Sequence, residues 1–160
     1  MSFVEFAHHN HAHCIARTLS RVEATCTARG LHLTPVRRRV LEILLNRHNA
    51  LGAYDILDIL RTEGLGSQPP VVYRALEFLT KHGFAHRIER LNAFAACHHP
   101  GADHAPAFLI CRQCDVVAEI WGHGIRDAMH RTAQTIGFTI ERMVLEVEGV
   151  CPNCQDGVAP

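Results

Sequence analysis

Apolar residues recur at helical spacing in four segments of the first half of the chain. Between Cys14 and Arg29 they fall at steps of four, three and four, and Gly30 supplies a stop. The segment "LTPVRRRVLEILLNRH" has Thr34 as a helix N-cap and Pro35 in the first turn. "GAYDILDILRTEG" lies between glycines, and "PPVVYRALEFLTKHG" begins with prolines and ends at a glycine. The pattern therefore predicts four consecutive helices.

The pattern changes after the fourth predicted helix. "FAHRIER" and "AFAAC" are short strand-like runs on either side of a turn near Leu91 and Asn92. Two such strands directly after a helix–turn–helix predict a winged helix-turn-helix domain. Beyond "HHPGADHAP", which has no periodicity, we expect strands at "AFLIC" and "VVAEIW", a helix at 124–136 and a strand at "FTIERMVLEVEG".

These elements predict an α+β protein in two parts. Residues 1–97 would form the winged-helix domain, 98–106 a hinge, and 107–160 a small α/β domain that needs a staple or a partner for stability. Residues 1–13 would be a leader that contains several histidines. Two interpretations of that leader remain as alternatives: an auxiliary metal-binding tract and a frayed polar segment.

Charge divides the chain in the same way. The sequence has 160 residues and no net charge, but residues 1–92 hold 12 Lys and Arg against 8 Asp and Glu, whereas 93–160 hold 4 against 8. A basic first part suits a polyanion. No apolar run is long enough to span a membrane, and the start of the chain lacks a secretory pattern, so we expect a cytoplasmic protein without a membrane partner.

The fourth predicted helix has one apolar side and one polar side. Tyr73, Arg74 and Lys81 share the polar side, where an arginine can reach the O6 and N7 edge of guanine. Tyr54 and Arg37, with the neighbouring arginines of the "RRR" run, are candidates for the phosphate backbone. The alternative is that these side chains are only solvent-facing charges.

Two cysteine pairs, in "ICRQCD" and "VCPNCQ", repeat the same spacing. Disulfides do not persist in the cytoplasm, and an odd total of seven cysteines cannot pair fully. Redox pairs of the thioredoxin type begin a helix, whereas each pair here follows a predicted strand. Four thiolates at the corners of a tetrahedron suit Zn²⁺, so we expect a structural zinc at Cys111, Cys114, Cys151 and Cys154. Redox chemistry and coincidence are the alternatives.

A second group of potential ligands lies around the boundary between the two parts. His86, Cys97, His104 and Glu119 offer two imidazoles, one thiolate and one carboxylate, which together complete a tetrahedral site. Each residue alone has an ordinary structural explanation as a core, surface or ion-paired side chain. The other candidates near the same boundary are His98, His99, Asp103 and His123.

The segments "LTPVRRRVLEILL", "GAYDILDILR" and "PPVVYRALEFL", with the two Cys-x-x-Cys pairs, resemble the ferric uptake regulator family. The likeness is greatest to its zinc uptake regulator branch and runs from about Cys14 to Cys154. It implies a homodimeric bacterial repressor with an N-terminal winged-helix domain and a C-terminal dimerisation domain. The segment between Cys97 and His104 is slightly shorter than the family pattern.

By position, the resemblance assigns the four paired cysteines to the structural zinc site. It assigns His86, Cys97, His104 and Glu119 to the regulatory site of the zinc branch. It further implies that Tyr73 and Arg74 contact DNA through the recognition helix and that Tyr54 contacts a phosphate.

These observations lead to one functional hypothesis. We expect a zinc-responsive repressor of zinc-uptake genes, with two zinc ions per chain, that binds a palindromic duplex as a homodimer when its regulatory site is filled. The Cys97 thiolate favours zinc, but regulation by iron, manganese or nickel is an alternative. A zinc-stapled protein–protein adaptor is another. An enzyme is not expected, because nothing in the sequence indicates an open metal position beside a substrate cleft.

Overall fold

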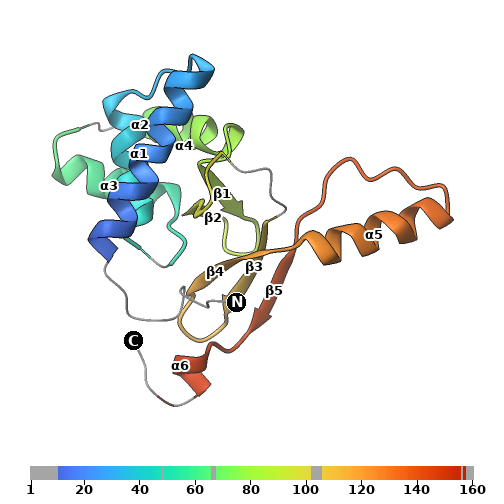
Figure 1. Cartoon of the computed structure of the whole chain (residues 1–160). Coiled ribbons are helices and arrows are strands. Elements are labelled where there is room, and N and C mark those ends of the chain that lie inside the picture. Colours follow the sequence, from blue (N-terminus) through green and yellow to red (C-terminus); the bar gives the residue numbers. More distant parts are fainter. Residues whose placement is uncertain (1–10, 48, 66–67, 102–105, 156, 158–160) are drawn as a thin grey trace.

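The first half of the chain folds into four helices followed by a two-stranded hairpin (Figure 1). The computed structural model describes residues 11–47, 49–65, 68–101, 106–155 and 157. The elements of this half are α1 (His11–Arg29), α2 (Pro35–Leu45), α3 (Ala53–Thr62), α4 (Pro69–Lys81), β1 (Ala85–Ile88) and β2 (Ala93–Ala96). They confirm the predicted winged helix-turn-helix.

Local signals in the sequence account for the helix ends. The Thr34 side chain accepts a hydrogen bond from the Arg37 amide, 3.3 Å away, and Pro35 takes the first helical position of α2. Gly83, which follows α4, has a φ of 73°, a backbone conformation that disfavours residues with a Cβ. The buried sides of the four helices then form one apolar core, centred on Val22, Val40, Leu41, Ile56, Leu60, Val72, Leu76 and Leu79.

The hairpin β1–β2 is the wing. Its strands are antiparallel, with His86 opposite Ala95 and Ile88 opposite Ala93, and Asn92 closes the turn with a φ of 46°. Leu51, just before α3, forms an isolated bridge to Phe94 of β2. The wing is thereby tied to the helical core on one side, since Phe84 and Ala96 are buried in that core.

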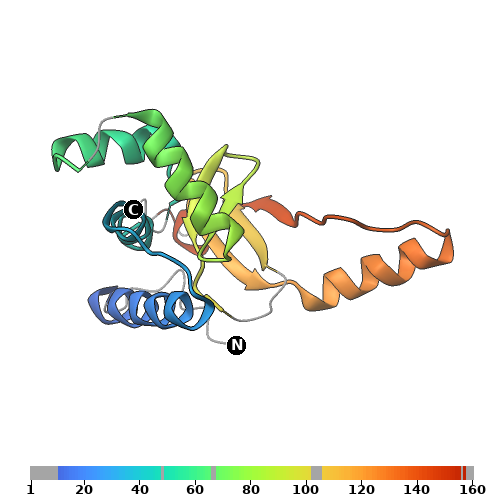
Figure 2. The ribbon, with the colours of Figure 1, turned by 90° about the horizontal axis from the view of Figure 1, so that it is seen from above.

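The second half contains a three-stranded sheet and one long helix. Its elements are β3 (Pro106–Cys111), β4 (Val117–Trp121), α5 (His123–Thr135), β5 (Glu146–Gly149) and the one-turn helix α6 (Pro152–Gln155). The sheet order is β4-β3-β5, with β3 antiparallel to β4 and parallel to β5. Figures 1 and 2 show α5 extending away from both the sheet and the four helices.

The strand predicted over 138–149 is much shorter in the structure. Only Glu146–Gly149 pairs with β3, and the preceding residues 138–145 contain no strand. Phe138 and Val144, in the first part of the predicted strand, are exposed in the single chain. The pattern therefore gave the right element with the wrong start.

The wing packs on the sheet of the second half through a small apolar cluster. Ile88 of the wing lies with Phe108, Ile110 and Val117 of the sheet, and Leu91 packs against them. This cluster is separate from the main helical core. Within the described residues, no helix is both long and apolar enough to cross a membrane.

Candidate metal centres and nucleic-acid interface

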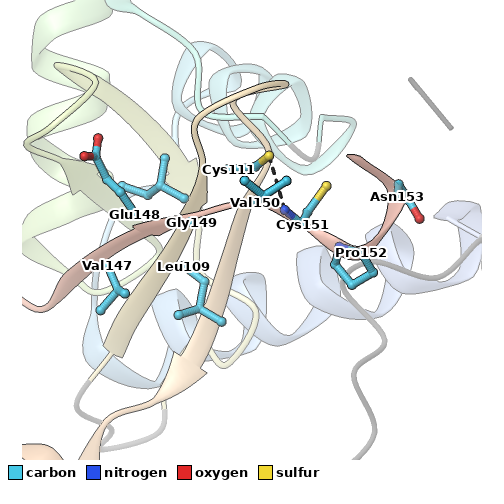
Figure 3. Close-up of a pocket in the computed structure, with 10 residues that line it drawn as sticks. Leu109, Cys111, Val147, Glu148, Gly149, Val150, Cys151, Pro152 and Asn153 are labelled. Atoms are coloured by element: carbon cyan, nitrogen blue, oxygen red, sulfur yellow. Dashed lines mark hydrogen bonds between the residues drawn. The ribbon is translucent and has the colours of Figure 1, made fainter. Parts of the chain in front are cut away.

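The two Cys-x-x-Cys pairs converge at the end of the β3–β5 sheet. Cys111 is the last residue of β3, and Cys151 immediately precedes α6. The Cys151 amide donates a hydrogen bond to the Cys111 sulfur at 3.3 Å, as Figure 3 shows, and the sulfurs of Cys114 and Cys151 are 3.7 Å apart. The four cysteine sulfurs all lie within 4.8 Å of one another.

This spacing fits zinc. Two thiolates about 2.3 Å from a tetrahedral Zn²⁺ lie about 3.8 Å from each other, close to the Cys114–Cys151 separation. Burial raises the pKa of Cys111, but the amides of Cys151, Gln113 and Cys114 outweigh it and lower that pKa to about 6. Burial and the neighbouring sulfurs raise the pKa of Cys154 to about 12. A cation is therefore required if all four sulfurs are to be thiolates at neutral pH.

A second cluster joins the wing to the sheet. His86 comes from β1, Cys97 directly follows β2, and Glu119 lies in β4, yet their ligand atoms also lie within 4.8 Å of one another. The His86 Nε2 atom is 3.4 Å from Glu119 Oε1, and the Cys97 sulfur is 3.8 Å from the same oxygen. Cys97 is completely buried, and Glu119 is only 7% exposed.

The donor set and distances of this cluster also fit zinc. Tetrahedral coordination places nitrogen and oxygen ligands about 3.4 Å apart and sulfur and oxygen ligands about 3.6 Å apart. Burial raises the pKa of Glu119, but the hydrogen bond and charge of His86, with the His98 amide, lower it to about 2. Burial and the Glu119 charge raise the pKa of Cys97. The fourth predicted ligand, His104, lies outside the described residues, as does Asp103.

The remaining histidines of this region have other contacts. The His98 amide donates to Glu119 Oε2 at 2.9 Å. The rings of His99 and His123 lie against Trp121, with centroid distances of 4.8 Å and 5.4 Å. None of these three side chains joins the two ligand clusters found among the described residues.

The polar side of α4 is open to solvent. Tyr73 is 49% exposed, and Arg74 and Lys81 are also exposed, while the opposite side of the helix is buried in the core. Tyr54, in the first turn of α3, is 65% exposed. The helix–turn–helix thus presents two tyrosines, one arginine and one lysine on its outer surface.

The arginine run at the start of α2 is engaged within the chain. Arg37 donates to the His32 carbonyl at 2.6 Å, and its guanidinium lies 3.8 Å from the centre of the Phe78 ring. Arg38 pairs with Glu23 and Glu42, and Arg39 pairs with Glu42 and Glu63. These acidic partners offset part of the positive charge that the sequence suggested for this surface.

One contact between the two halves involves a residue that the sequence did not single out. Asn49, in the connection between α2 and α3, donates from its side chain to the Cys114 carbonyl at 3.3 Å. The same residue forms an isolated bridge with Val116. The segment that carries Cys111 and Cys114 therefore contacts the helix-turn-helix half directly. No motif around Asn49 could have revealed this, because its partner is 65 positions away.

Known proteins resemble this chain over most of its length. It is 39% identical to the zinc uptake regulation protein of Escherichia coli K12 across 85% of this chain and 80% of that protein. A solved structure of a zinc uptake regulator complexed with zinc and DNA superposes with a TM-score of 0.84 at 37% identity, covering 89% of this chain and 96% of that one.

Two forms of another relative differ in how well they superpose. Holo XcZur, 40% identical, gives a TM-score of 0.79 over 86% of this chain and 96% of its own. Apo XcZur, also 40% identical, gives 0.51 over 88% and 97%. The chain therefore superposes better on the holo form than on the apo form. A sequence model described as the ferric uptake regulator family matches residues 28–148, and the chain belongs to that family.

Proposed function

We propose that this chain is a zinc-responsive transcriptional repressor that binds palindromic operator DNA as a homodimer and represses zinc-uptake genes. The observation that carries the proposal is the buried cluster of His86, Cys97 and Glu119, which links the wing to the C-terminal sheet. The likeness to a zinc uptake regulator complexed with zinc and DNA supports the same reading. The chain would act as a regulator rather than an enzyme, and in the cytoplasm, where its operator lies.

We assign two zinc ions to each chain, with different roles. The four cysteines Cys111, Cys114, Cys151 and Cys154 would hold a structural ion, because all four lie at one end of one sheet. His86, Cys97 and Glu119 would hold a regulatory ion with His104 as the fourth ligand. The thiolate in this second set favours zinc over iron or manganese, which prefer nitrogen and oxygen donors.

The wing transmits the state of the regulatory site to α4. The Cys97 amide donates to the Phe84 carbonyl at 3.0 Å, and Phe84, three residues beyond the end of α4, is buried in the helical core. A link from His86 and Cys97 to Glu119 would therefore fix the orientation of α4 relative to the C-terminal sheet. A zinc ion held by His86, Cys97 and Glu119 would supply that link. A coupling of ~1–3 kcal/mol, or roughly 5–150-fold in DNA affinity, is typical for such systems.

Superposition on the two forms of XcZur supports this zinc-dependent link between the wing and the sheet. The chain has the same sequence identity to both forms, so the difference in TM-score does not come from sequence distance. In this chain the wing packs on the sheet, an arrangement we call closed, and the better superposition on the holo form supports it as the zinc-bound state. We infer that the DNA-binding state is this closed state.

A homodimer is needed to read a palindrome, and the C-terminal half offers the surface for it. Large apolar side chains are exposed along α5, the following segment and β5: Ile125, Met129, Ile136, Phe138, Val144 and Val147. An apolar groove lined by residues 109–111 of β3 and 147–153 of β5 and the segment after it continues this surface (Figure 3). Exposed apolar surface of this extent marks a protein–protein interface. A second copy would place two α4 helices on successive major grooves.

Stepwise removal of zinc tests the two-site proposal. A chelator of moderate strength should release a palindromic duplex while the protein keeps one zinc per chain, its helical circular dichroism and its dimeric mass. Adding zinc back should restore DNA binding. If DNA release and unfolding always occur together, there is no separate regulatory ion.

Arg74→Ala tests the reading role of α4. We expect a loss of ~1–3 kcal/mol in operator binding and relaxed preference at one base position, because Arg74 would no longer reach a guanine edge. Lys81→Ala is the matched control, since loss of a phosphate contact weakens all sequences equally and lowers the salt dependence. Binding profiles over a library of single-base operator variants measure both effects. An unchanged profile for Arg74→Ala would remove this residue from base reading.

A further inference from the structure

Two glutamates lie in one row across the C-terminal sheet. Phe108 in β3 is directly opposite Glu119 of β4 and also directly opposite Glu146 of β5. Residues opposite each other on neighbouring strands point to the same face. The face that holds Glu119 is the one on which the wing packs, because the Phe108 ring is 5.4 Å from the His86 ring. Both carboxylates therefore stand beneath the wing.

The Glu146 side chain binds the backbone of the wing turn. Its Oε1 atom accepts a hydrogen bond from the Glu89 amide at 2.6 Å, and its Oε2 atom accepts one from the Arg90 amide at 2.9 Å. Both oxygens are thus used, and both donors belong to the main chain of the turn. An ionised acceptor makes hydrogen bonds about twice as strong as a neutral one. This contact involves none of the proposed metal ligands.

Side-chain ion pairs surround this contact. Arg142 Nη2 is 2.6 Å from a carboxylate oxygen of Glu89, and Arg90 forms an ion pair with Glu148 of β5. Beneath them, Ile88 of the wing is completely buried against the sheet. The turn end of the wing is therefore fastened to β5, at the opposite end of the same row of residues from Glu119.

We propose that Glu146 is a positioning residue for the regulatory metal site. It holds the wing over the sheet without a metal and so brings His86 and Cys97 to Glu119 before zinc arrives. This inference rests on the proposed zinc-responsive function and deepens it. Glu119 contacts His86 and Cys97 of the metal site and the His98 amide, whereas Glu146 contacts the backbone of the wing turn.

Glu146 would therefore help to set the zinc concentration at which the regulatory site fills. The apparent affinity of a site is its intrinsic affinity multiplied by the fraction of molecules in the binding-competent arrangement. Glu146 raises that fraction, so removing it lowers the apparent zinc affinity without altering any ligand. Once zinc is saturating, the closed arrangement is populated again, and DNA affinity returns close to its original value.

The test compares Glu146→Ala and Glu146→Gln with the unchanged dimer, each carrying its structural zinc. Glu146→Ala removes both acceptor oxygens, and we expect a roughly tenfold weaker regulatory zinc affinity. Glu146→Gln keeps one acceptor oxygen, and its affinity should lie between the two. Competition against a zinc-binding dye measures this directly, with no DNA present. Glu141→Gln is the control, because it removes one charge from an exposed glutamate of the same segment.

The outcomes are distinct. The proposal holds if zinc affinity falls in the order unchanged protein, Glu146→Gln, Glu146→Ala, while Glu141→Gln, structural zinc content and dimer mass are unaltered. It is overturned if Glu146→Ala binds regulatory zinc normally, or if it loses structural zinc or the dimer, which would mean a purely structural role. If the unchanged protein binds a second zinc without any gain in DNA affinity, the proposed repressor function fails instead.

Discussion

The two candidate zinc sites use similar chemistry in different places. The four cysteines lie at one end of a single sheet, at and just after the end of β3 and just before and within α6, so an ion there would hold one half of the chain together. His86 and Cys97 belong to the wing and Glu119 to the sheet, so an ion there joins two halves. The position of the ligands, more than their identity, separates an anchor from a switch.

Loss of the anchor should have the largest effect. Structural zinc supplies ~10–16 kcal/mol in finger peptides, and a small three-stranded sheet cannot replace that stabilisation. We expect Cys111→Ser to lose its structural zinc, its dimer and the folded C-terminal half. Circular dichroism, zinc content and sedimentation measure these losses. Cys14→Ser, at a half-buried cysteine of α1, is the control and should retain all three properties.

Loss of the switch should spare the fold. Cys97→Ser replaces one sulfur by oxygen at a completely buried position, so we expect a folded dimer that keeps its structural zinc. The roughly 5–150-fold gain in DNA affinity on adding zinc should disappear. Duplex binding with and without zinc measures this gain. If Cys97→Ser and Cys111→Ser behave alike, the division into anchor and switch is wrong.

The two sites should also differ, by a smaller amount, in how zinc affinity depends on pH. The pKa of Cys97 is raised, so its thiol is protonated near neutral pH and must lose that proton to bind zinc. Glu119, with a pKa of about 2, is already ionised and releases none. Regulatory affinity should therefore rise about tenfold per pH unit above neutrality. At the four-cysteine site, the two thiols whose pKa is raised, Cys114 and Cys154, should give a steeper rise. Dye competition at several pH values gives both slopes.

Local signals made the winged-helix half predictable. Thr34 and Pro35 predicted the start of α2, and glycines predicted helix ends, because caps and turns depend on a few neighbouring residues. The two metal-ligand clusters could be proposed because cysteine and histidine are rare, chemically distinctive residues. Whether His104 completes the second cluster stays a prediction, since it lies outside the described residues.

Long-range pairing explains what the sequence did not reveal. Arg39 binds Glu63 across 24 positions, so the carboxylates that offset the arginine run were not evident from the run itself. Glu146 sits in a strand that reads as alternating charge and valine, and only its register against Phe108 brings it beneath the wing. The strand start was misplaced because 138–145 has apolar alternation but no strand partner within the described chain.

The contacts of Trp121 with the rings of His99 and His123 have a practical consequence. It is the sole tryptophan of the chain and lies two residues from Glu119. The ring of His99, two residues after Cys97, meets it edge-on, and the ring of His123 stacks on it. Indole emission is sensitive to nearby imidazole and to solvent. The protein thus carries its own optical reporter at the joint, and unlabelled dimers can be followed by stopped-flow fluorescence as the two halves close.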